Sequence, residues 1–393
     1  MIIRAAKRLG REAAYAAFRV YCATLPRKPF APEEVRKILV PLYAGVGNIV
    51  LYTPALRAIR RRFPHAEIVV AVGGSRSNQD VAGPAVVDRV VEIPAQARFG
   101  ERRRAIKSLK RERFDLCINA FHVVYPFQVA FTAFARIPWR CGHVTSPGWS
   151  NPYDFLYNVP ARMERDQHEI DRYLELAYAV GVSRDSVDDK PFIHVPATAR
   201  SVAVELLAAR GIAPDDAFVA VHAGTSHVMR WKQWGVDRFE EVVRLAGRSP
   251  ALKFVLVGAP DERAEMQKMS ERLSAELNGR FVDLVGETDV PTLAAIIERA
   301  TALVGNDSGP MQIAVALGVP NVIPWGPSDF PRNRPRGPLH TVLFKALPCS
   351  PCYRMPGDSK VHLCNDHQCL SQITVAEVTD ALRARIAAER SRV

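Results

Sequence analysis

Two successive parts of the chain alternate short apolar runs with stretches of helical periodicity. In the first part, residues 36–43 (RKILVPLY), 67–72 and 115–119 are apolar and rich in β-branched side chains, which is typical of strands buried on both faces. Residues 53–63 repeat apolar positions with a helical period, and Pro54 suits the first turn of that helix. The pattern predicts a parallel sheet with helices on both faces.

The same alternation restarts in the second half of the chain. A predicted helix at residues 168–180 precedes it, and a hinge is expected in the polar stretch 181–190 and the segment 191–216 that follows. The predicted strands of the second half are residues 217–223, 253–258, 281–285, 302–305 and 321–325, with a helix at 236–246.

Two such halves predict an α/β chain of two doubly wound, Rossmann-like domains facing a cleft, which is a GT-B-like architecture. The predicted divisions are a basic N-terminal helical segment at 1–35, a first domain at 36–190, a second domain at 191–370 and a C-terminal helix at 371–393. Ligands of such sheets bind beyond the carboxyl ends of the strands. The candidate chemistry is therefore expected in the loops after Tyr43, Ala223, Gly258 and Gly305.

The loop after Gly305 has the strongest pattern for phosphate binding. It reads GNDSGP and leads directly into a helix predicted at 311–317. Free N–H groups and the dipole at a helix start attract an anion, so Asp307, Ser308 and Gly309 are candidate binding residues. The structural alternative is a helix cap at Asp307 and a turn at Gly309.

The loop after Ala223 offers hydroxyl groups and a positive charge. Thr225 and Ser226 follow the strand, and Lys232 precedes the next helix. Hydroxyl donors with one point charge suit a diphosphate, whereas the alternative for Lys232 is an ordinary surface position.

Two further strand-end loops carry weaker patterns. Asp261 and Glu262 follow Gly258, where a carboxylate either accepts hydrogen bonds from ribose hydroxyls or forms an acidic first helical turn. The first-strand loop, residues 43–54, lacks the G-x-G-x-x-G and Walker patterns, but its glycines bring backbone close to the expected cleft.

The composition is that of a globular, two-domain chain. Its 393 residues exceed what one core usually organises, and its hydrophobic and charged fractions, 48% and 24%, are ordinary. No apolar run reaches the ~18 residues of a transmembrane helix, and the start lacks the continuous apolar stretch of a secretory signal. We therefore expect a cytoplasmic protein.

The net charge of +12 indicates an anionic partner. Half of the excess lies in residues 98–113, although a solvated helix face is the alternative. No nucleic-acid-binding motif accompanies the charge, which favours a phosphorylated lipid or glycan over nucleic acid. Residues 1–25 mix basic and apolar side chains, a pattern typical of a helix that lies on an anionic membrane or of one that packs on the protein body.

Taken together, these segments resemble glycosyltransferase family 9, the heptosyltransferases of lipopolysaccharide core assembly. The resemblance covers residues 36–380, and its combined pieces are specific. They are GNIVLYTPALRAIRRRFP, HAGTSHVMRWKQWGVDRF, GNDSGPMQIAVALGVPNVIPWGPS and the terminal CSPCYR and CNDHQCL. The family is GT-B in fold, inverts the anomeric centre and needs no metal for chemistry, with which the absence of a D-x-D motif agrees.

The resemblance implies a nucleotide-sugar donor in the second domain and an anionic, lipid-linked glycan acceptor on the first. It implies donor contacts by Thr225, Ser226, Lys232, Glu262, Asp307, Ser308 and Gly309, with Lys232 also stabilising the leaving group and Glu262 contacting the ribose. Gly45, Gly47 and Asn48 would form the acceptor-side loop.

Two positions depart from the family pattern. Family members have an aspartate general base where this sequence has Asn48, and many have histidine at Gln312. Because an asparagine amide accepts no proton, Asn48 is predicted to position the acceptor while His122, Asp80 or a donor phosphate oxygen takes the proton. A different nucleotide-sugar donor, a non-catalytic nucleotide- or glycan-binding member and a nucleotide-sugar epimerase are the alternatives.

Four of the seven cysteines cluster as Cys349-x2-Cys352-x11-Cys364-x4-Cys369. Two thiolate pairs at this separation can hold a structural zinc or iron, and a reducing cytoplasm favours a metal over disulfides. Related autotransporter heptosyltransferases carry an iron-bound cysteine finger that the spacing resembles in part. Free buried thiols are the alternative.

The sequence therefore predicts an inverting transferase that moves a heptose from ADP-heptose onto a lipopolysaccharide core or related glycan. It is expected in the cytoplasm with peripheral contact to the inner membrane surface, and without a cofactor for its chemistry.

Overall fold

The computed structural model describes residues 2–25, 27–73, 81–93, 98–120, 131–147, 150–164, 166–354, 358–359, 364 and 366–391, with backbone alone at 2–11, 99, 228, 354 and 358–359. These residues form two compact units. The first comprises Met1–Ala44, Pro54–Gln79 and Pro84–Asp189, and the second comprises Gly45–Thr53, Asp80–Gly83 and Lys190–Val393. The segment Gly45–Thr53, which follows the first strand, thus groups with the second unit.

The first unit is built on a six-stranded parallel sheet in the order β3-β2-β1-β4-β5-β6. Its strands are β1 (Lys37–Pro41), β2 (Glu67–Val72), β3 (Arg89–Glu92), β4 (Leu116–Ile118), β5 (Trp139–His143) and β6 (Val159–Ala161). Its helices are α1 (Ile2–Ala23), α2 (Val46–Arg62, shared with the second unit), α3 (Phe99–Glu112) and α5 (Glu169–Ala179), with short 3-10 turns η1 (Pro32–Glu34), η3 (Asp154–Leu156) and η4 (Arg184–Ser186).

The strands with long apolar runs, β1, β2 and β4, lie where the sequence predicts them. Strand β5 was not predicted because it carries buried polar side chains. Arg140, 1% exposed, donates to the carbonyl oxygens of Ile137 (2.6 Å) and Leu156 (2.8 Å), so the chain itself satisfies the charge that breaks the apolar pattern.

The predicted start of the helix at residue 53 is wrong. Helix α2 begins at Val46, and Pro54 lies inside it. A proline at this position lacks the N–H that would bond the Val50 carbonyl. The Thr53 hydroxyl donates to that carbonyl instead (2.7 Å), which lets the helix continue through the proline.

The second unit repeats the same strand order around its own sheet, β12-β11-β10-β7-β8-β9. Its strands are β7 (Phe218–His222), β8 (Lys253–Leu256), β9 (Phe281–Asp283), β10 (Ala302–Gly305), β11 (Asn321–Trp325) and β12 (His340–Phe344), with the small pair β13 (Tyr353–Arg354) and β14 (Asp358–Ser359). Its helices are α6 (Ala197–Ala209), α7 (Val236–Ala246), α8 (Arg263–Leu277), α9 (Val290–Arg299), α10 (Gly309–Leu317), α11 (Phe330–Asn333), α12 (Gln368–Ser371) and α13 (Val375–Arg390), and its 3-10 turns are η5 (His227–Lys232) and η6 (Pro260–Glu262).

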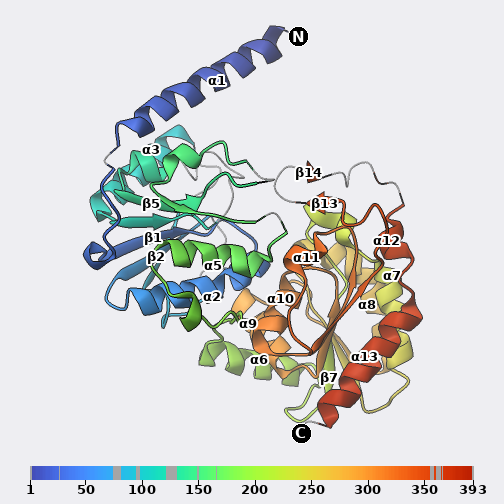
Figure 1. Ribbon diagram of the computed structural model, residues 1–393. Helices are drawn as coiled ribbons and strands as arrows, with labels where there is room; N and C mark the ends of the chain where they lie inside the picture. The colour runs from blue at the N-terminus through green and yellow to red at the C-terminus, as the bar shows by residue number, and fades with distance from the viewer. Residues whose placement is uncertain are drawn as a thin grey trace. The chain divides into compact units, whose positions relative to one another are not determined.

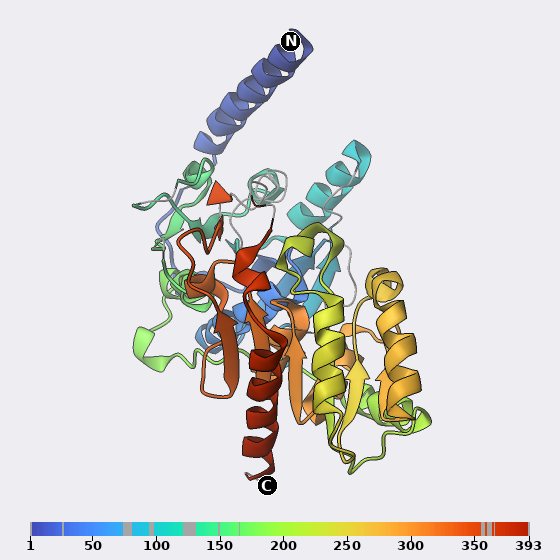
Figure 2. The ribbon, with the colours of Figure 1, turned by 90° about the vertical axis from the view of Figure 1, so that its right-hand side faces the viewer.

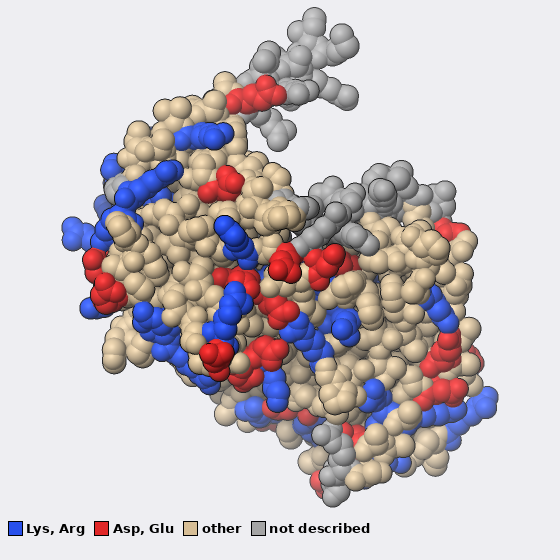
Figure 3. Space-filling model, viewed as in Figure 1, with Lys and Arg blue, Asp and Glu red and all other residues tan. Residues whose placement is uncertain are grey.

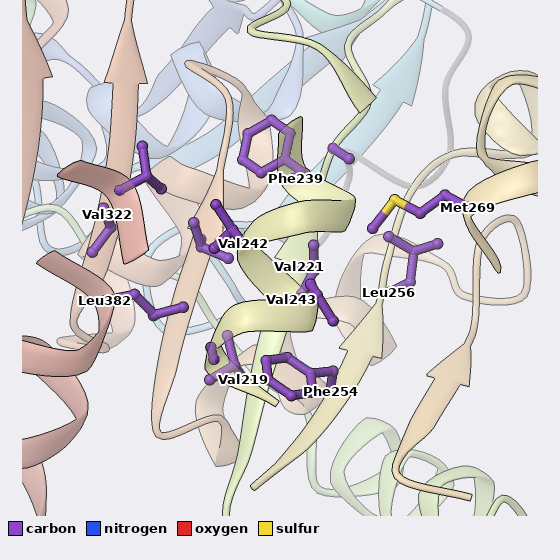
Figure 4. Packing of buried hydrophobic residues seen from close by; sticks show 14 of the residues in the cluster. Val219, Val221, Phe239, Val242, Val243, Phe254, Leu256, Met269, Val322 and Leu382 are labelled. Carbon is purple, nitrogen blue, oxygen red and sulfur yellow. The ribbon is translucent and has the colours of Figure 1, made fainter. Parts of the chain in front are cut away.

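Helices cover both faces of the second sheet. Figure 1 shows α6, α9 and α10 on one side of the strands and α7, α8 and α13 on the other, and Figure 2 shows the second group in front of the sheet. In Figure 4, Phe239, Val242 and Val243 of α7 point toward the strands, where they meet Val221 of β7 and Phe254 of β8. The predicted α/β fold with two Rossmann-like halves is confirmed, since both sheets have the strand order of a doubly wound dinucleotide-binding domain.

The end of α1 packs on the first unit. Cys22 and Leu25 are buried in a small cluster with Ala133 and Leu156, and the rings of Phe18 and Tyr21 pack against it. This part of the N-terminal segment therefore follows the packing alternative. Among the helices that the structure describes, none combines the length and apolar character needed to cross a bilayer.

We predict that the first unit loses stability below about pH 6.5 through His143. Its ring is 3% exposed, and burial lowers its pKa to about 4, although Nε2 donates to the Arg172 carbonyl oxygen at 2.8 Å. As the pH falls between the unfolded and the folded pKa values, the unfolded chain binds a proton on this histidine that the buried native ring does not. The free energy of unfolding therefore falls by about 1.4 kcal/mol for each pH unit in that range. Chemical denaturation at pH 7 and pH 5 should show this loss, and His143→Gln should flatten it. An unchanged pH dependence in His143→Gln would rule out this histidine as the cause.

Candidate functional site

A cavity of about 410 Å³ lies in the second unit at the carboxyl ends of β7 and β10. These two strands are neighbours at the point where the strand order reverses, which is where open α/β sheets bind their ligands. The cavity is lined by Gly45, Val46, Gly47, Asn48, Leu51, Thr225, Ser226, Met229, Lys232, Asp307, Ser308, Gly309, Gln312 and Asn333. Four separate segments of sequence thus meet at one site.

The start of α10 opens into this cavity without a side-chain cap. Ser308 occupies the N-cap position, but its hydroxyl caps no backbone N–H of the helix. Pro310 at the second helical position has no N–H, so the groups left for a ligand are those of Gly309 and Met311. Their N–H groups and the helix dipole make this end of the helix attractive to an anion.

Gly309 is required by the close approach of the first-strand loop. A Cβ atom on Gly309 would lie 2.5 Å from Cγ1 of Val46, and one on Gly47 would lie 3.4 Å from the Cα of Gly309. Gly309 therefore lets the segment that carries Asn48 lie directly against the start of α10, whereas a side chain at Gly47 would make only ordinary contacts.

Lys232 and Asp307 form an ion pair inside the cavity. The distance from Nζ to Oδ2 is 2.8 Å, and the two side chains are 19% and 8% exposed. Lys232 ends η5, and Asp307 stands two residues before Gly309. A ligand phosphate at the helix start would therefore meet the ammonium group of Lys232 beside the free N–H groups.

Asn306 fixes the geometry of this pair, and sequence reasoning assigned it no role. Its side chain is fully buried, and Nδ2 donates to the carbonyl oxygens of Ala223 (2.8 Å) and Gly224 (3.0 Å). Oδ1 accepts a hydrogen bond from the N–H of Trp234 (2.9 Å), just after Lys232. The sequence does contain a signal for this role, since Asn306 is an amide residue placed directly after a buried strand.

Two buried polar atoms of the cavity have no hydrogen-bond partner among the residues that the structure describes. They are Oγ1 of Thr225 and Oε1 of Gln312, on side chains only 3% and 4% exposed. Nε2 of Gln312 donates to the Asn333 carbonyl oxygen (3.1 Å), which orients Oε1 as the open acceptor. Buried polar atoms without a hydrogen-bond partner destabilise a folded protein. These two atoms therefore indicate that the cavity binds a polar ligand.

Most of the residues predicted for the site line this cavity. They are Gly45, Gly47, Asn48, Thr225, Ser226, Lys232, Asp307, Ser308 and Gly309. Asp80 and His122, the suggested proton acceptors, lie outside the described residues.

Glu262 does not line the cavity. Its carboxylate, on a residue 5% exposed, accepts the Ala259 N–H (2.6 Å) and faces Nε2 of His222 at 3.4 Å. Burial opposes its ionisation, but the contacts with His222 and the Ala259 amide outweigh burial and lower the pKa of this carboxyl. A ribose contact at Glu262 stays a prediction.

The four clustered cysteines belong to the second unit, and none of them lines the cavity. Burial, together with the nearby thiols of Cys352, Cys364 and Cys349, raises the pKa of Cys369 to about 11. Within the described ranges, however, no three His, Cys, Asp or Glu side chains are placed to hold a metal ion.

Comparison with known proteins identifies the family. Residues 102–361 match the model of glycosyltransferase family 9 (heptosyltransferase). The chain belongs to this family. The enzyme is thus a glycosyltransferase, as the sequence motifs predict.

Curated relatives span most of the chain. Lipopolysaccharide heptosyltransferase 2 of Salmonella typhimurium is 25% identical over 302 residues, which are 75% of this chain and 83% of the relative. Lipooligosaccharide heptosyltransferase 2 of Haemophilus ducreyi is 25% identical over 372 residues, which are 89% of this chain and 99% of the relative.

Solved structures share the fold. The family 9 glycosyltransferase of Veillonella parvula superposes with a TM-score of 0.75 at 20% identity, covering 92% of this chain and 99% of that one. The E. coli ADP-heptose lipopolysaccharide heptosyltransferase II superposes with a TM-score of 0.71 at 22% identity, covering 90% and 99%. The predicted GT-B-like fold is confirmed.

Proposed function

We propose that this glycosyltransferase moves a heptose from ADP-heptose, with inversion, onto a lipopolysaccharide core or a related glycan. The observation that carries the proposal is the cavity at the start of α10, which combines free helix N–H groups, Lys232 and two unsatisfied polar atoms. Two findings support the donor: the curated relatives are heptosyltransferases, and E. coli heptosyltransferase WaaC, with a TM-score of 0.64, was solved with ADP-2-deoxy-2-fluoro heptose.

The lining residues match the parts of a nucleotide sugar. The N–H groups of Gly309 and Met311 and the ammonium of Lys232 suit the negative oxygens of a diphosphate. The hydroxyls of Thr225 and Ser226 supply further donors on the same side of the cavity. Oε1 of Gln312 needs a donor, and a sugar hydroxyl provides one.

The reaction is a displacement at the anomeric carbon. The acceptor oxygen forms its bond to that carbon as the bond to the diphosphate breaks, and the leaving group keeps the electron pair. Lys232 and the start of α10 then stabilise the charge that grows on the diphosphate. Among the described residues that line the cavity, Asp307 is the carboxylate, so we assign the acceptor proton to Asp307 and the positioning of the acceptor hydroxyl to Asn48.

The surface of α3 supports an anionic acceptor. Arg104, Lys107, Lys110 and Arg111 are exposed on this helix. On the face seen in Figure 3, Lys and Arg side chains are interspersed with Asp and Glu. The exposed basic residues of α3 attract phosphorylated glycans and the anionic headgroups of a membrane, so we propose a lipid-linked acceptor reached by peripheral contact with the inner membrane from the cytoplasm.

The decisive experiment measures ADP release from ADP-heptose by the purified protein with a panel of truncated lipopolysaccharide cores. Release that depends on one acceptor would establish heptosyl transfer. Absence of release while ADP still binds would point to another donor sugar or to a binding-only member. If no nucleotide binds, the proposal fails altogether.

We predict that Gln312→Leu separates sugar binding from nucleotide binding. The variant removes the unsatisfied Oε1 but also the hydrogen bond from Nε2 to the Asn333 carbonyl oxygen, so the unfolding free energy of the free protein should change little. The loss of an acceptor for a sugar hydroxyl should weaken ADP-heptose binding about tenfold while leaving ADP binding unchanged. Calorimetric titration with the two ligands tests this. Equal weakening of both ligands would place Gln312 outside the sugar site.

We also propose a structural zinc or iron at Cys349, Cys352, Cys364 and Cys369. The support is the spacing of the cysteines. Elemental analysis of protein purified without added metal should find about one zinc or iron per chain. A Cys349→Ser, Cys352→Ser variant should lose it, and metal-free native protein would contradict the proposal.

A further inference from the structure

The Ser308 hydroxyl is held away from the helix that it precedes. Serine at an N-cap position usually accepts a hydrogen bond from the second or third N–H of its helix. Here the hydroxyl donates to the Asn306 carbonyl oxygen (3.0 Å), Oγ also lies 3.0 Å from Nδ1 of His222, and it caps no N–H of α10. His222, at the end of β7, is 3% exposed.

Glu262 orients the His222 ring. Its Oε2 faces Nε2 of His222 at 3.4 Å, and the same oxygen accepts the Ala259 N–H at 2.6 Å. Because the Ser308 hydroxyl has one proton and donates it to the Asn306 carbonyl oxygen, Nδ1 engages a lone pair of Oγ, the group that would otherwise accept from a helix N–H. The serine is thus engaged by the ring rather than by the helix.

Two strand-end glycines make room for the carboxylate. A Cβ atom on Gly224 would lie 2.4 Å from Oε1 of Glu262, and one on Gly258 would lie 2.9 Å from Oε2. The carboxylate therefore sits in a space that exists only because both loops lack a side chain there. The arrangement spans the ends of three strands, β7, β8 and β10.

The orientation of Ser308 decides whether one N–H remains open. Because Pro310 has no N–H, the Met311 N–H is the group that a capping serine would bind. A serine turned back onto the helix would compete with any phosphate for that N–H.

We propose that His222, oriented by Glu262, is a positioning residue that holds the Ser308 hydroxyl off α10 and so keeps the Met311 N–H open for the donor diphosphate. This inference rests on the proposed nucleotide site. It predicts that loss of the ring contact at Nδ1 weakens ADP binding through Ser308 and not through lost packing.

The test is a double-variant cycle read by calorimetric titration of the full chain with ADP. The amide of His222→Gln reaches the position of Nε2, so it keeps a partner for Glu262 and loses the partner of Ser308. We expect its Kd for ADP to rise about fivefold, the equivalent of one N-cap hydrogen bond. In a Ser308→Ala background the same change should alter Kd by less than about 1.5-fold, because the competing hydroxyl is gone.

His222→Asn is the matched conservative variant. Its amide reaches the position of Nδ1, so it should recover most of the affinity that His222→Gln loses. Thermal melts check folding, and His222→Met, which fills similar volume without a polar group at Nδ1, replaces His222→Gln if that variant does not fold.

Equal losses of ADP affinity with and without the Ser308 hydroxyl would overturn the inference, as would no loss in either background. Both results leave the nucleotide site intact. Failure of the native protein to bind ADP would instead remove the proposed function, and this inference with it.

Discussion

Replacing Lys232 by alanine is expected to lower kcat/KM for sugar transfer by about 10³-fold. The substitution removes the ammonium group that lies beside the free N–H groups at the start of α10. It also leaves Asp307, 8% exposed and previously 2.8 Å from Nζ, as an unpaired negative charge next to the diphosphate. Both effects act on the same ligand, so donor binding and leaving-group stabilisation should fall together. Rates of ADP release over a range of donor concentrations measure the loss.

A matched control comes from Lys268, an exposed lysine on α8 in the same unit. Lys268→Ala changes the net charge equally and should retain native kcat/KM. Lys232→Arg keeps the charge but changes its shape, so it should recover only part of the activity. Activity of Lys232→Ala within tenfold of the native enzyme would show that this lysine does not contact the diphosphate.

The Asp307→Asn variant is expected to separate chemistry from binding. If Asp307 accepts the proton of the acceptor hydroxyl, kcat should fall by about 10²- to 10³-fold. The amide is nearly isosteric and removes a negative charge beside the diphosphate, so ADP should bind at least as tightly as before. This pattern differs from the one expected for Lys232→Ala, in which binding of the donor weakens together with catalysis. Single-turnover rates combined with the Kd for ADP distinguish the two.

Asp261→Asn provides the control for Asp307. Asp261 lies in η6, the neighbouring strand-end turn, and its side chain is 54% exposed. Its substitution should leave kcat unchanged. Native kcat in Asp307→Asn would mean that the proton goes to another acceptor, with a donor phosphate oxygen the first to examine.

The elements that the sequence predicted best are those whose apolar pattern is unbroken. Strands β2, β10 and β11 and helix α7 have the predicted bounds, because an apolar run of this kind can only be buried in a sheet or against one. Strand β5 was not predicted, because Arg140 interrupts its apolar pattern. The carbonyl groups that accept hydrogen bonds from Arg140 come near it only when the chain folds. The start of α2 was misplaced, because the Thr53 hydroxyl replaces the hydrogen bond that Pro54 cannot make.

The sequence also predicted which strand-end loops carry the polar and charged residues of the site. Loops at the carboxyl ends of parallel strands meet at one edge of the sheet, so Thr225, Lys232 and Asp307 were expected together, and all three line the cavity. The family followed from the same motifs.

Only the tertiary structure decided how those residues are paired. The contact of Lys232 with Asp307 and the contacts of His222 with Ser308 and Glu262 join residues 40 to 86 positions apart. The same folding leaves Oε1 of Gln312 without a partner among the described residues. Residue type and spacing state which groups donate, accept or carry charge. Which of them meet, and which is left open for a ligand, depends on distances of a few ångström that exist only once both loops are held against the same sheet.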